Sequence, residues 1–399
     1  MRKTRLLAGM IAIGMFCASL TACGGSSANS GETTKNEEAK TQEEGTAEKA
    51  SEDAGSKEPM EFNFAFVCWG YSDVLAQGYQ SSLQAITDGL MTLEQPIKVN
   101  WEWVACTQDE NLDVCESLCR KGVDAVITIR LNTAMVDVFN ENETLFGCYT
   151  VFPDEVEEYA MQSPYWVGTI HEKKVDATID GLQALLDQGC KEIALMGPAP
   201  GNEQHDKMWP IWYEMLEEYP DIIVHEYKGE DRNEAMKNFI SLYPNLDGVC
   251  DTAGSAGYGE ATVAAIRSEG KVGQIAYQTV SVFEDTEAAL QDGILIFTAD
   301  GTHASPTHIF VMLLNRLMGT PLSEKPEIVD WPYVYIESVE DYENYVKYAY
   351  DEKYPMIAFQ EYEPYFKWLN PEATFEDFYE LADTLTLDKI IERHADFIG

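Results

Sequence analysis

The chain has 399 residues, of which 69 are acidic and 27 are basic, so its formal net charge is −42. This surplus of carboxylates argues against a nucleic-acid-binding protein, because such binding depends on Lys and Arg that neutralise phosphates, and against adsorption to anionic lipid. An apolar content of 45% is that of an ordinary globular protein, and the length favours two domains.

The first 22 residues have the pattern of an export signal. Arg2, Lys3 and Arg5 precede an apolar run over 6–20, which is too short to span a bilayer. The run ends in Leu-Thr-Ala-Cys at 20–23, which resembles a bacterial lipobox, where cleavage precedes the cysteine and its thiol is acylated. The competing interpretation is an ordinary signal peptide. We expect 1–22 to be removed and Cys23 to anchor the protein on the extracytoplasmic face of the cell membrane.

A polar segment follows the anchor. Residues 23–60 are rich in Glu, Ser, Gly and Lys and contain no aromatic residue. As a flexible coil this segment would span about 30–35 Å. It therefore predicts a disordered acidic tether that keeps a folded domain clear of the membrane.

Seven cysteines remain after Cys23. An exported protein can pair its cysteines, but the odd number and the apolar surroundings predict that most of them are small buried hydrophobic residues. Cys115 and Cys119 lie one helical turn apart, but no nearby histidine completes a zinc ligand set. We expect no metal site and no cofactor.

From residue 62 onward, short apolar runs alternate with segments of helical periodicity, a pattern typical of parallel sheets covered by helices. The first series predicts strands at 62–68, 96–105, 123–129 and 145–152. The second predicts strands at 191–197, 222–227, 246–251, 274–278 and 293–299. The fold class is therefore α/β, with two Rossmann-like lobes.

Several segments carry a resemblance to a known family. They are Gly168-Thr169 with the helix after it, Gly-Cys-Lys-Glu-Ile-Ala-Leu-Met-Gly at 189–197, Asn-Leu-Asp-Gly-Val-Cys-Asp at 245–251, and the helix-to-strand step at 288–295. In order and spacing they resemble type I periplasmic binding proteins, nearest to the ribose- and galactose-type sugar-binding branch. The resemblance covers about 62–322 and implies two lobes joined by a hinge.

On this basis we expect an N-terminal lobe of 61–168 and 300–325, and a C-terminal lobe of 169–299 and 326–336. Residues 337–399 form acidic and aromatic helical segments beyond the family's usual tail. We expect this helical extension to pack against a lobe; the alternative is a surface that docks a partner.

Ligands of open α/β folds bind at the carboxyl ends of the strands. The residues that follow the expected strands are therefore the candidates for ligand binding: Trp69, Tyr71, Asp73, Arg130, Asn132, Thr150, His205, Trp209, Asp251, Thr252, Gln278, Thr279 and Asp300. The resemblance implies aromatic rings stacked on a sugar and planar polar groups on its hydroxyls. In the competing interpretation the aromatic residues belong to the core or rim, Asp251 and Asp300 cap helices, and His205 lies in a surface loop.

Carboxylates outnumber arginines among these candidates, which favours a neutral polyol, an aminosugar or a nucleoside over an anion. The resemblance implies a monomeric binding protein, not an enzyme, that delivers a small polar solute, in the first place a sugar, to an ABC permease. The alternatives are an exported carbohydrate-active hydrolase and a sensory binding protein that docks on a receptor kinase. The leader and acidic tether exclude the DNA-binding head of cytoplasmic repressors that share this fold.

Overall fold

The computed structural model describes residues 57–72, 74–150, 152–201, 203–350 and 355–395. The expected signal peptide, Cys23 and most of the tether lie outside the described residues, as does Asp73.

The first lobe is built on a six-stranded sheet in the order β11-β5-β4-β3-β1-β2, in which all neighbours are parallel. Its strands are β1 (Met60–Cys68), β2 (Ile97–Ala105), β3 (Ala125–Thr128), β4 (Leu145–Cys148), β5 (Trp166–Glu172) and β11 (Glu327–Trp331). Its helices are α1 (Val74–Leu90), α2 (Asn111–Lys121), α3 (Thr133–Glu141), α4 (Asp154–Ala160) and α11 (Ser305–Leu317).

Strand β1 shows why this sheet is buried on both faces. Phe64 and Phe66 point into the core formed with α1 and α11, whereas Ala65 and Val67 point into the core formed with α2, α3 and α4. Successive side chains of a strand alternate between faces, so an uninterrupted apolar run is what a doubly covered parallel strand requires.

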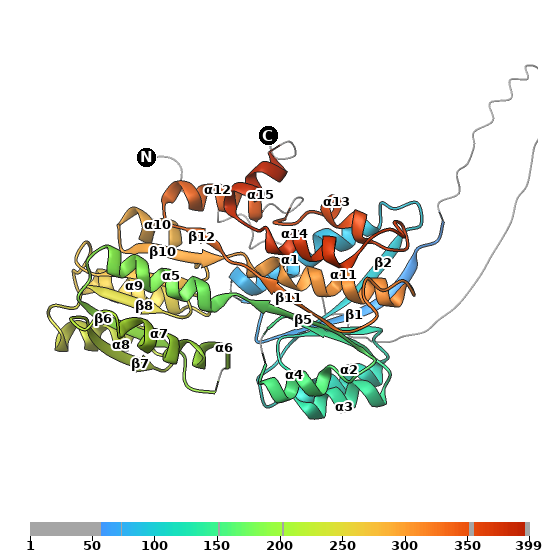
Figure 1. Ribbon diagram of the computed structural model, residues 1–399, viewed down its shortest axis with the longest axis horizontal. Helices are drawn as coiled ribbons and strands as arrows, with labels where there is room; N and C mark the ends of the chain where they lie inside the picture. The colour runs from blue at the N-terminus through green and yellow to red at the C-terminus, as the bar shows by residue number, and fades with distance from the viewer. Residues whose placement is uncertain (1–56, 73, 151, 202, 351–354, 396–399) are drawn as a thin grey trace, which may run out of the picture. The chain divides into compact units, whose positions relative to one another are not determined.

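The second lobe repeats the plan with the sheet order β12-β10-β9-β8-β6-β7, in which only β12 is antiparallel to its neighbour. Its strands are β6 (Glu192–Gly197), β7 (Ile223–Lys228), β8 (Gly248–Asp251), β9 (Ala276–Val280), β10 (Leu295–Asp300) and β12 (Val334–Ile336). Its helices are α5 (Lys174–Asp187), α6 (Glu203–Asp206), α7 (Met208–Leu216), α8 (Arg232–Leu242), α9 (Tyr258–Ser268) and α10 (Thr286–Gln291). The predicted fold class is confirmed (Figure 1).

Within the described residues the chain passes between the two sheets three times: after β5, after β10 and between β11 and β12. Segment 326–336, expected wholly in the second lobe, is divided, because β11 pairs with β5 of the first sheet and β12 with β10 of the second. Strand β5 also continues four residues beyond the expected boundary at 168. Gly168 lets β11 approach closely, since a Cβ there would lie 1.8 Å from the carbonyl oxygen of Glu327.

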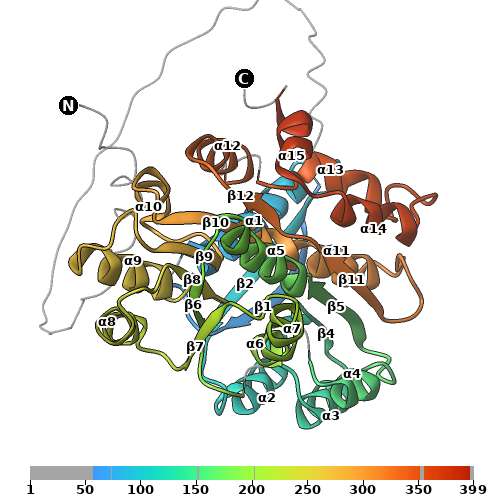
Figure 2. The same ribbon diagram turned by 60° about the vertical axis from the view of Figure 1, so that its left-hand side comes forward.

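The C-terminal extension contains α12 (Val339–Ala349), α13 (Phe359–Tyr362), α14 (Phe375–Asp383) and α15 (Leu387–His394). Ser338, Thr374 and Thr386 cap three of these helices by accepting a hydrogen bond from a first-turn amide. Helix α12 contacts α10 and β12 of the second lobe, whereas α13 contacts α1 and α14 contacts β11 of the first. Figures 1 and 2 show the extension lying along both lobes.

Two buried polar residues of α11 bind the extension. His308 is hydrogen-bonded through Nδ1 to the Tyr362 hydroxyl at 2.7 Å and through Nε2 to the Phe378 carbonyl at 3.3 Å. The Asn315 side chain donates to the Tyr365 carbonyl and accepts from the Lys367 amide. The extension is thus part of the folded structure, because its backbone satisfies buried groups of α11 that would otherwise lack partners.

No helix among the described residues is both long and apolar enough to cross a membrane. The same part of the chain holds no group of three or more His, Cys, Asp or Glu side chains arranged for a metal ion. All seven described cysteines are buried, as the sequence predicts for most of them.

Candidate functional site

A cavity of about 300 Å³ lies between the two lobes. Residues that follow β1, β3, β4 and β5 form one side, and residues that follow β6, β8 and β9 form the other. The carboxyl ends of both parallel sheets therefore face one shared space, the position where open α/β folds bind ligands. The described lining is Trp69, Leu75, Tyr79, Ile129, Tyr149, Thr150, Glu172, Lys174, Pro198, Gln204, His205, Ala253, Ser255, Ala256, Tyr258, Ser281, Thr302 and Tyr333.

The first lobe supplies an aromatic wall. The rings of Trp69 and Tyr79 meet edge to face with centroids 6.0 Å apart, and those of Tyr79 and Tyr149 do so at 5.1 Å. Tyr79 and Tyr149 are almost completely buried, whereas Trp69 is half-buried. Aromatic residues held in this way offer rigid apolar surface at low entropic cost.

The second lobe supplies a polar wall centred on His205. Its Nδ1 lies 2.8 Å from the Thr252 hydroxyl, and its Nε2 lies 3.4 Å from Nζ of Lys174. Burial lowers the pKa of His205 well below its ordinary value, and the neighbouring Lys174 and Arg232 charges add to this effect. The imidazole is therefore neutral, with Nδ1–H donating to Thr252 and Nε2 accepting from Lys174.

Glu172 and Lys174 flank the first crossing between the lobes. Oε2 of Glu172 accepts hydrogen bonds from Gln204 at 2.8 Å and from the Tyr333 hydroxyl at 3.2 Å. Burial raises the pKa of Glu172 to about 7, against the lowering effects of Gln204 and Lys174. Burial lowers the pKa of Lys174 to about 8, against the attraction of Glu172 and Asp251. Both groups thus change charge close to neutral pH.

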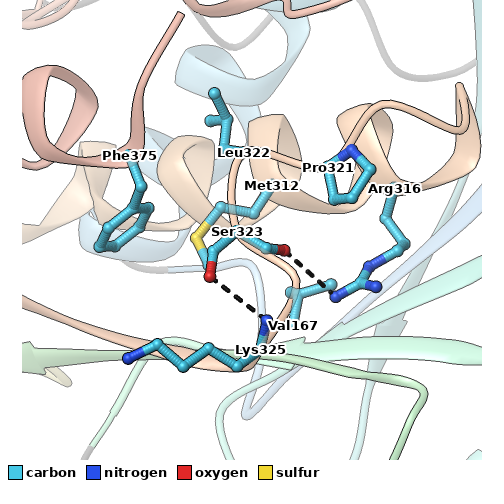
Figure 3. Close-up of a pocket in the computed structure, with 8 residues that line it drawn as sticks. All are labelled: Val167, Met312, Arg316, Pro321, Leu322, Ser323, Lys325 and Phe375. Atoms are coloured by element: carbon cyan, nitrogen blue, oxygen red, sulfur yellow. Dashed lines mark hydrogen bonds between the residues drawn. The ribbon is translucent and has the colours of Figure 1, made fainter.

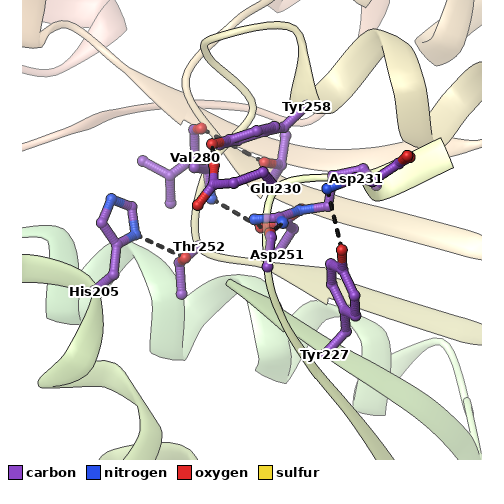
Figure 4. Close-up of polar contacts among 12 residues, drawn as sticks. His205, Tyr227, Glu230, Asp231, Asp251, Thr252, Tyr258 and Val280 are labelled. Carbon is purple, nitrogen blue, oxygen red and sulfur yellow. Dashed lines mark hydrogen bonds and ion pairs between the residues drawn. The ribbon is translucent and has the colours of Figure 1, made fainter. Parts of the chain in front are cut away.

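A buried ion pair supports the polar wall from behind (Figure 4). Nε of Arg232 donates to Oδ2 of Asp251 at 2.6 Å, and both side chains are fully buried. Oδ1 of Asp251 also accepts from the backbone amide of Ala253, which lines the cavity. The Arg232 guanidinium lies 4.3 Å from the ring centre of Tyr258, another lining residue. The pair therefore holds the loop after β8 in place beneath the cavity.

Three of the twelve ligand-binding candidates that the structure describes line the cavity: Trp69, Thr150 and His205. Thr252 lies directly behind them and orients His205. Asp251 is turned beneath the loop, because its carboxylate pairs with Arg232.

In the first lobe, three further candidates have partners inside the protein and lie outside the lining. The Tyr71 hydroxyl donates to the Phe66 carbonyl at 2.9 Å, and Nη1 of Arg130 donates to the Cys106 carbonyl at 3.2 Å. Asn132 caps α3 by accepting from the Met135 amide. These are structural roles that a polar residue at a strand end also serves.

The remaining candidates of the second lobe are also held by internal partners. Trp209 packs edge to face on Trp212 in the core, with Nζ of Lys228 4.0 Å from its ring centre. Gln278 donates to Sγ of Cys250, and the Thr279 hydroxyl donates at 3.5 Å to the Val280 carbonyl. Asp300 accepts from the amides of Val282 and Gly301, so it fixes two turns near the crossing.

Sequence reasoning missed Glu172, Lys174 and Tyr333, whereas Gln204 lies in the loop after β6 from which His205 and Trp209 were drawn as candidates. Its signal for the crossing was Gly168-Thr169, but it placed no strand at 166–172, and so the residues after that strand were not considered. A strand ending at Glu172 would have added Glu172 and Lys174 to the candidates.

A second hollow lies in the first lobe, beneath the loop that follows α11 (Figure 3). It measures about 10 Å³, and Arg316 in its lining donates to the Ser323 carbonyl at 3.4 Å. A space of this size holds about one water molecule. The cavity between the lobes is therefore the candidate site.

Comparison with known proteins gives the fold a family context. No family model matches the chain, and no curated protein matches it. Solved structures do. GanP, a glucose-galactose binding protein from Geobacillus stearothermophilus, has a TM-score of 0.57 and 13% identity over 70% of this chain and 98% of its own. A periplasmic solute-binding protein of an ABC transporter from Actinobacillus succinogenes, with bound D-allose, has a TM-score of 0.59 and 14% identity over 71% and 100%.

A third similar structure is an ABC transporter solute-binding protein from Bacillus halodurans with bound myo-inositol, with a TM-score of 0.57 and 14% identity over 73% of this chain and 99% of its own. The chain has the type I periplasmic binding protein fold. The predicted fold resemblance is confirmed, and at these identities the likeness concerns the fold.

Proposed function

We propose that the protein is a lipid-anchored, extracytoplasmic solute-binding protein that captures a small polar ligand, with a sugar as the leading candidate, and delivers it to an ABC permease. The observation that carries this proposal is the cavity between the lobes, in which an aromatic wall faces a polar wall. A sugar ring has apolar faces and polar edges, so it is complementary to both. The proteins of known structure with this fold that are named above are described as sugar- or solute-binding.

The proposal of a membrane anchor is supported by the sequence at 20–23, and the proposal of an ABC permease as partner is supported by the fold. Incorporation of labelled fatty acid tests the anchor: it should be lost when Cys23→Ser is introduced. Loss of sugar uptake in a strain lacking the chain supports delivery, whereas intact uptake with a lost transcriptional response supports docking on a receptor kinase.

The hydrolase alternative has less support from the cavity. Glycosidases of the common type need a pair of carboxyl groups beside the scissile bond. Among the described residues that line the cavity, Glu172 is the single carboxylic acid. A hydrolytic pair is therefore absent from this part of the lining.

Ligand-induced stabilisation tests the binding function. The mature chain carrying Cys23→Ser would be heated with neutral monosaccharides, cyclitols, aminosugars, nucleosides and amino acids. A ligand at a hundred times its Kd stabilises by about 2.7 kcal/mol, which corresponds to a Tm rise on the order of 5 °C. Turnover of a glycoside without any rise in Tm would favour the hydrolase.

A further inference from the structure

Glu172 is only half satisfied by the protein. Both of its hydrogen bonds, from Gln204 and Tyr333, reach Oε2. Within the part of the chain that the structure describes, Oε1 accepts none. Since an ionised carboxylate offers acceptor sites on both oxygens, this cavity-lining side chain keeps one oxygen for another donor.

Lys174 has hydrogen-bond donors for which the described part of the chain supplies no acceptor. Its side chain is buried, and its ammonium contacts the neutral His205 at 3.4 Å. In the described residues no carboxylate lies within 4.0 Å of its Nζ. An ammonium group carries three donors, so two remain for a partner in the cavity.

The electrostatics of the polar wall disfavour a partner that carries a single charge. When both are ionised, Glu172 and Lys174 bring one negative and one positive charge to the lining, and the Arg232–Asp251 pair behind it is balanced. An anionic ligand would gain from Lys174 but meet Glu172, and a cationic ligand would have the reverse difficulty. Hydroxyl groups can both donate and accept, so a neutral ligand with two neighbouring hydroxyls satisfies both side chains.

We propose that Glu172 and Lys174 form a subsite for two neighbouring hydroxyl groups of a neutral polyol, in which the carboxylate accepts from one hydroxyl and the ammonium donates to the other. This inference rests on the proposed sugar-binding function. It makes Glu172 and Lys174 specificity-determining residues and excludes uronic acids and aminosugars as preferred ligands. Gln204, Tyr333 and His205 position the two side chains.

The test measures affinity by titration calorimetry. Its probes are D-glucose, D-galactose, D-allose, L-arabinose and myo-inositol, together with glucuronate and glucosamine. Glu172→Gln keeps the oxygen that accepts from Gln204 and Tyr333 but replaces the second acceptor by a donor. Lys174→Met keeps an apolar stem and removes the donors. Lys173→Met is the matched control, because Nζ of Lys173 pairs with Asp383, and neither residue is in the cavity lining.

We expect each of the two variants to bind the best neutral probe about 10- to 100-fold more weakly, as is typical for hydrogen bonds to charged groups. Lys173→Met should bind within twofold of the unmodified protein. Singly deoxygenated analogues test the geometry without a variant: removal of either of two adjacent hydroxyls should weaken binding to the unmodified protein at least tenfold. In a double-mutant cycle, removal of the hydroxyl that faces Lys174 should weaken binding less in Lys174→Met than in the unmodified protein.

Two outcomes overturn the subsite while leaving the sugar-binding function intact: variants that bind the best probe within twofold of the unmodified protein, or tighter binding of glucuronate or glucosamine than of every neutral probe. Failure of all the sugars and cyclitols to bind the unmodified protein refutes the proposed function itself, and the subsite with it. Circular dichroism identifies a variant that fails to fold, and in that case the deoxygenated analogues decide the question.

Discussion

Replacement of Asp251 by Ala should destabilise the protein strongly, because it leaves the Arg232 guanidinium charged and buried. Both side chains are fully buried, and Nε of Arg232 lies 2.6 Å from Oδ2 of Asp251. Without the carboxylate, Arg232 retains the Gly229 carbonyl and the Tyr258 ring as partners, and neither carries a charge. The amide of Ala253 also loses its acceptor.

Removal of one partner of a buried ion pair typically costs 3–5 kcal/mol. For a lobe of this size the loss corresponds to a Tm decrease on the order of 10 °C. Urea unfolding followed by circular dichroism measures the free energy of unfolding. The double variant Arg232→Met/Asp251→Asn removes the buried charge and keeps an acceptor for the Ala253 amide, so it should recover most of the loss.

Ligand affinity separates this supporting role from direct contact. If Asp251 only supports the loop, folded Asp251→Ala protein still binds, with a moderate loss. Destabilisation below about 1 kcal/mol, or a double variant less stable than Asp251→Ala, would refute the reasoning.

Three other predictions concern charge, backbone and the extension. The pKa of Glu172 is about 7 in the folded protein, against an ordinary value of 4.5. Below about pH 4.5 its ionisation therefore does not change the free energy of unfolding, and between about pH 4.5 and 7 it lowers that free energy increasingly. Relative to Glu172→Gln, the unmodified protein should therefore lose up to about 3 kcal/mol of stability across this interval, and parallel pH profiles of unfolding in urea would contradict this. Gly168→Ala should cost about 3 kcal/mol or more in thermal unfolding, because φ is +135° and the added Cβ meets the Glu327 carbonyl of β11; an unchanged Tm would show that β11 can move away. Asn315→Leu should cost about 2–4 kcal/mol by leaving the Tyr365 carbonyl and the Lys367 amide without partners, and proteolysis should then cut the extension first; uniform resistance to protease would count against its docking through Asn315.

Much of the fold is predictable because long apolar runs leave little choice. Strand β1 is a mostly apolar run and forms at Met60–Cys68, where the sequence predicts a strand at 62–68. Helix α1 buries apolar residues at helical spacing, as the pattern of alternating strands and helices requires. Strand β5 was missed because Gly168, Thr169 and His171 interrupt its apolar pattern. Strands β11 and β12 have five and three residues, and both lie at sheet edges. Such short edge strands are held by backbone hydrogen bonds to their neighbours, so their sequences carry little hydrophobic pattern from which to predict them.

The candidate site was predictable in place but not in its residues. The topology brings strand ends together, so Trp69, Thr150 and His205 reach the cavity. Which way each terminal side chain points depends on partners distant in sequence, and Asp251 turns beneath the loop because Arg232 is there. Composition alone does not reveal such pairing.

The C-terminal extension also touches the hinge. His303 follows the cavity-lining Thr302, and its Nε2 is hydrogen-bonded to the Ala349 carbonyl at the end of α12. Because α12 contacts the second lobe while α13 and α14 contact the first, a rotation of one lobe against the other has to slide or strain these contacts. Under the proposed function, in which a ligand brings the two lobes together, these contacts would oppose the movement, and part of the ligand's binding free energy would be used to overcome them.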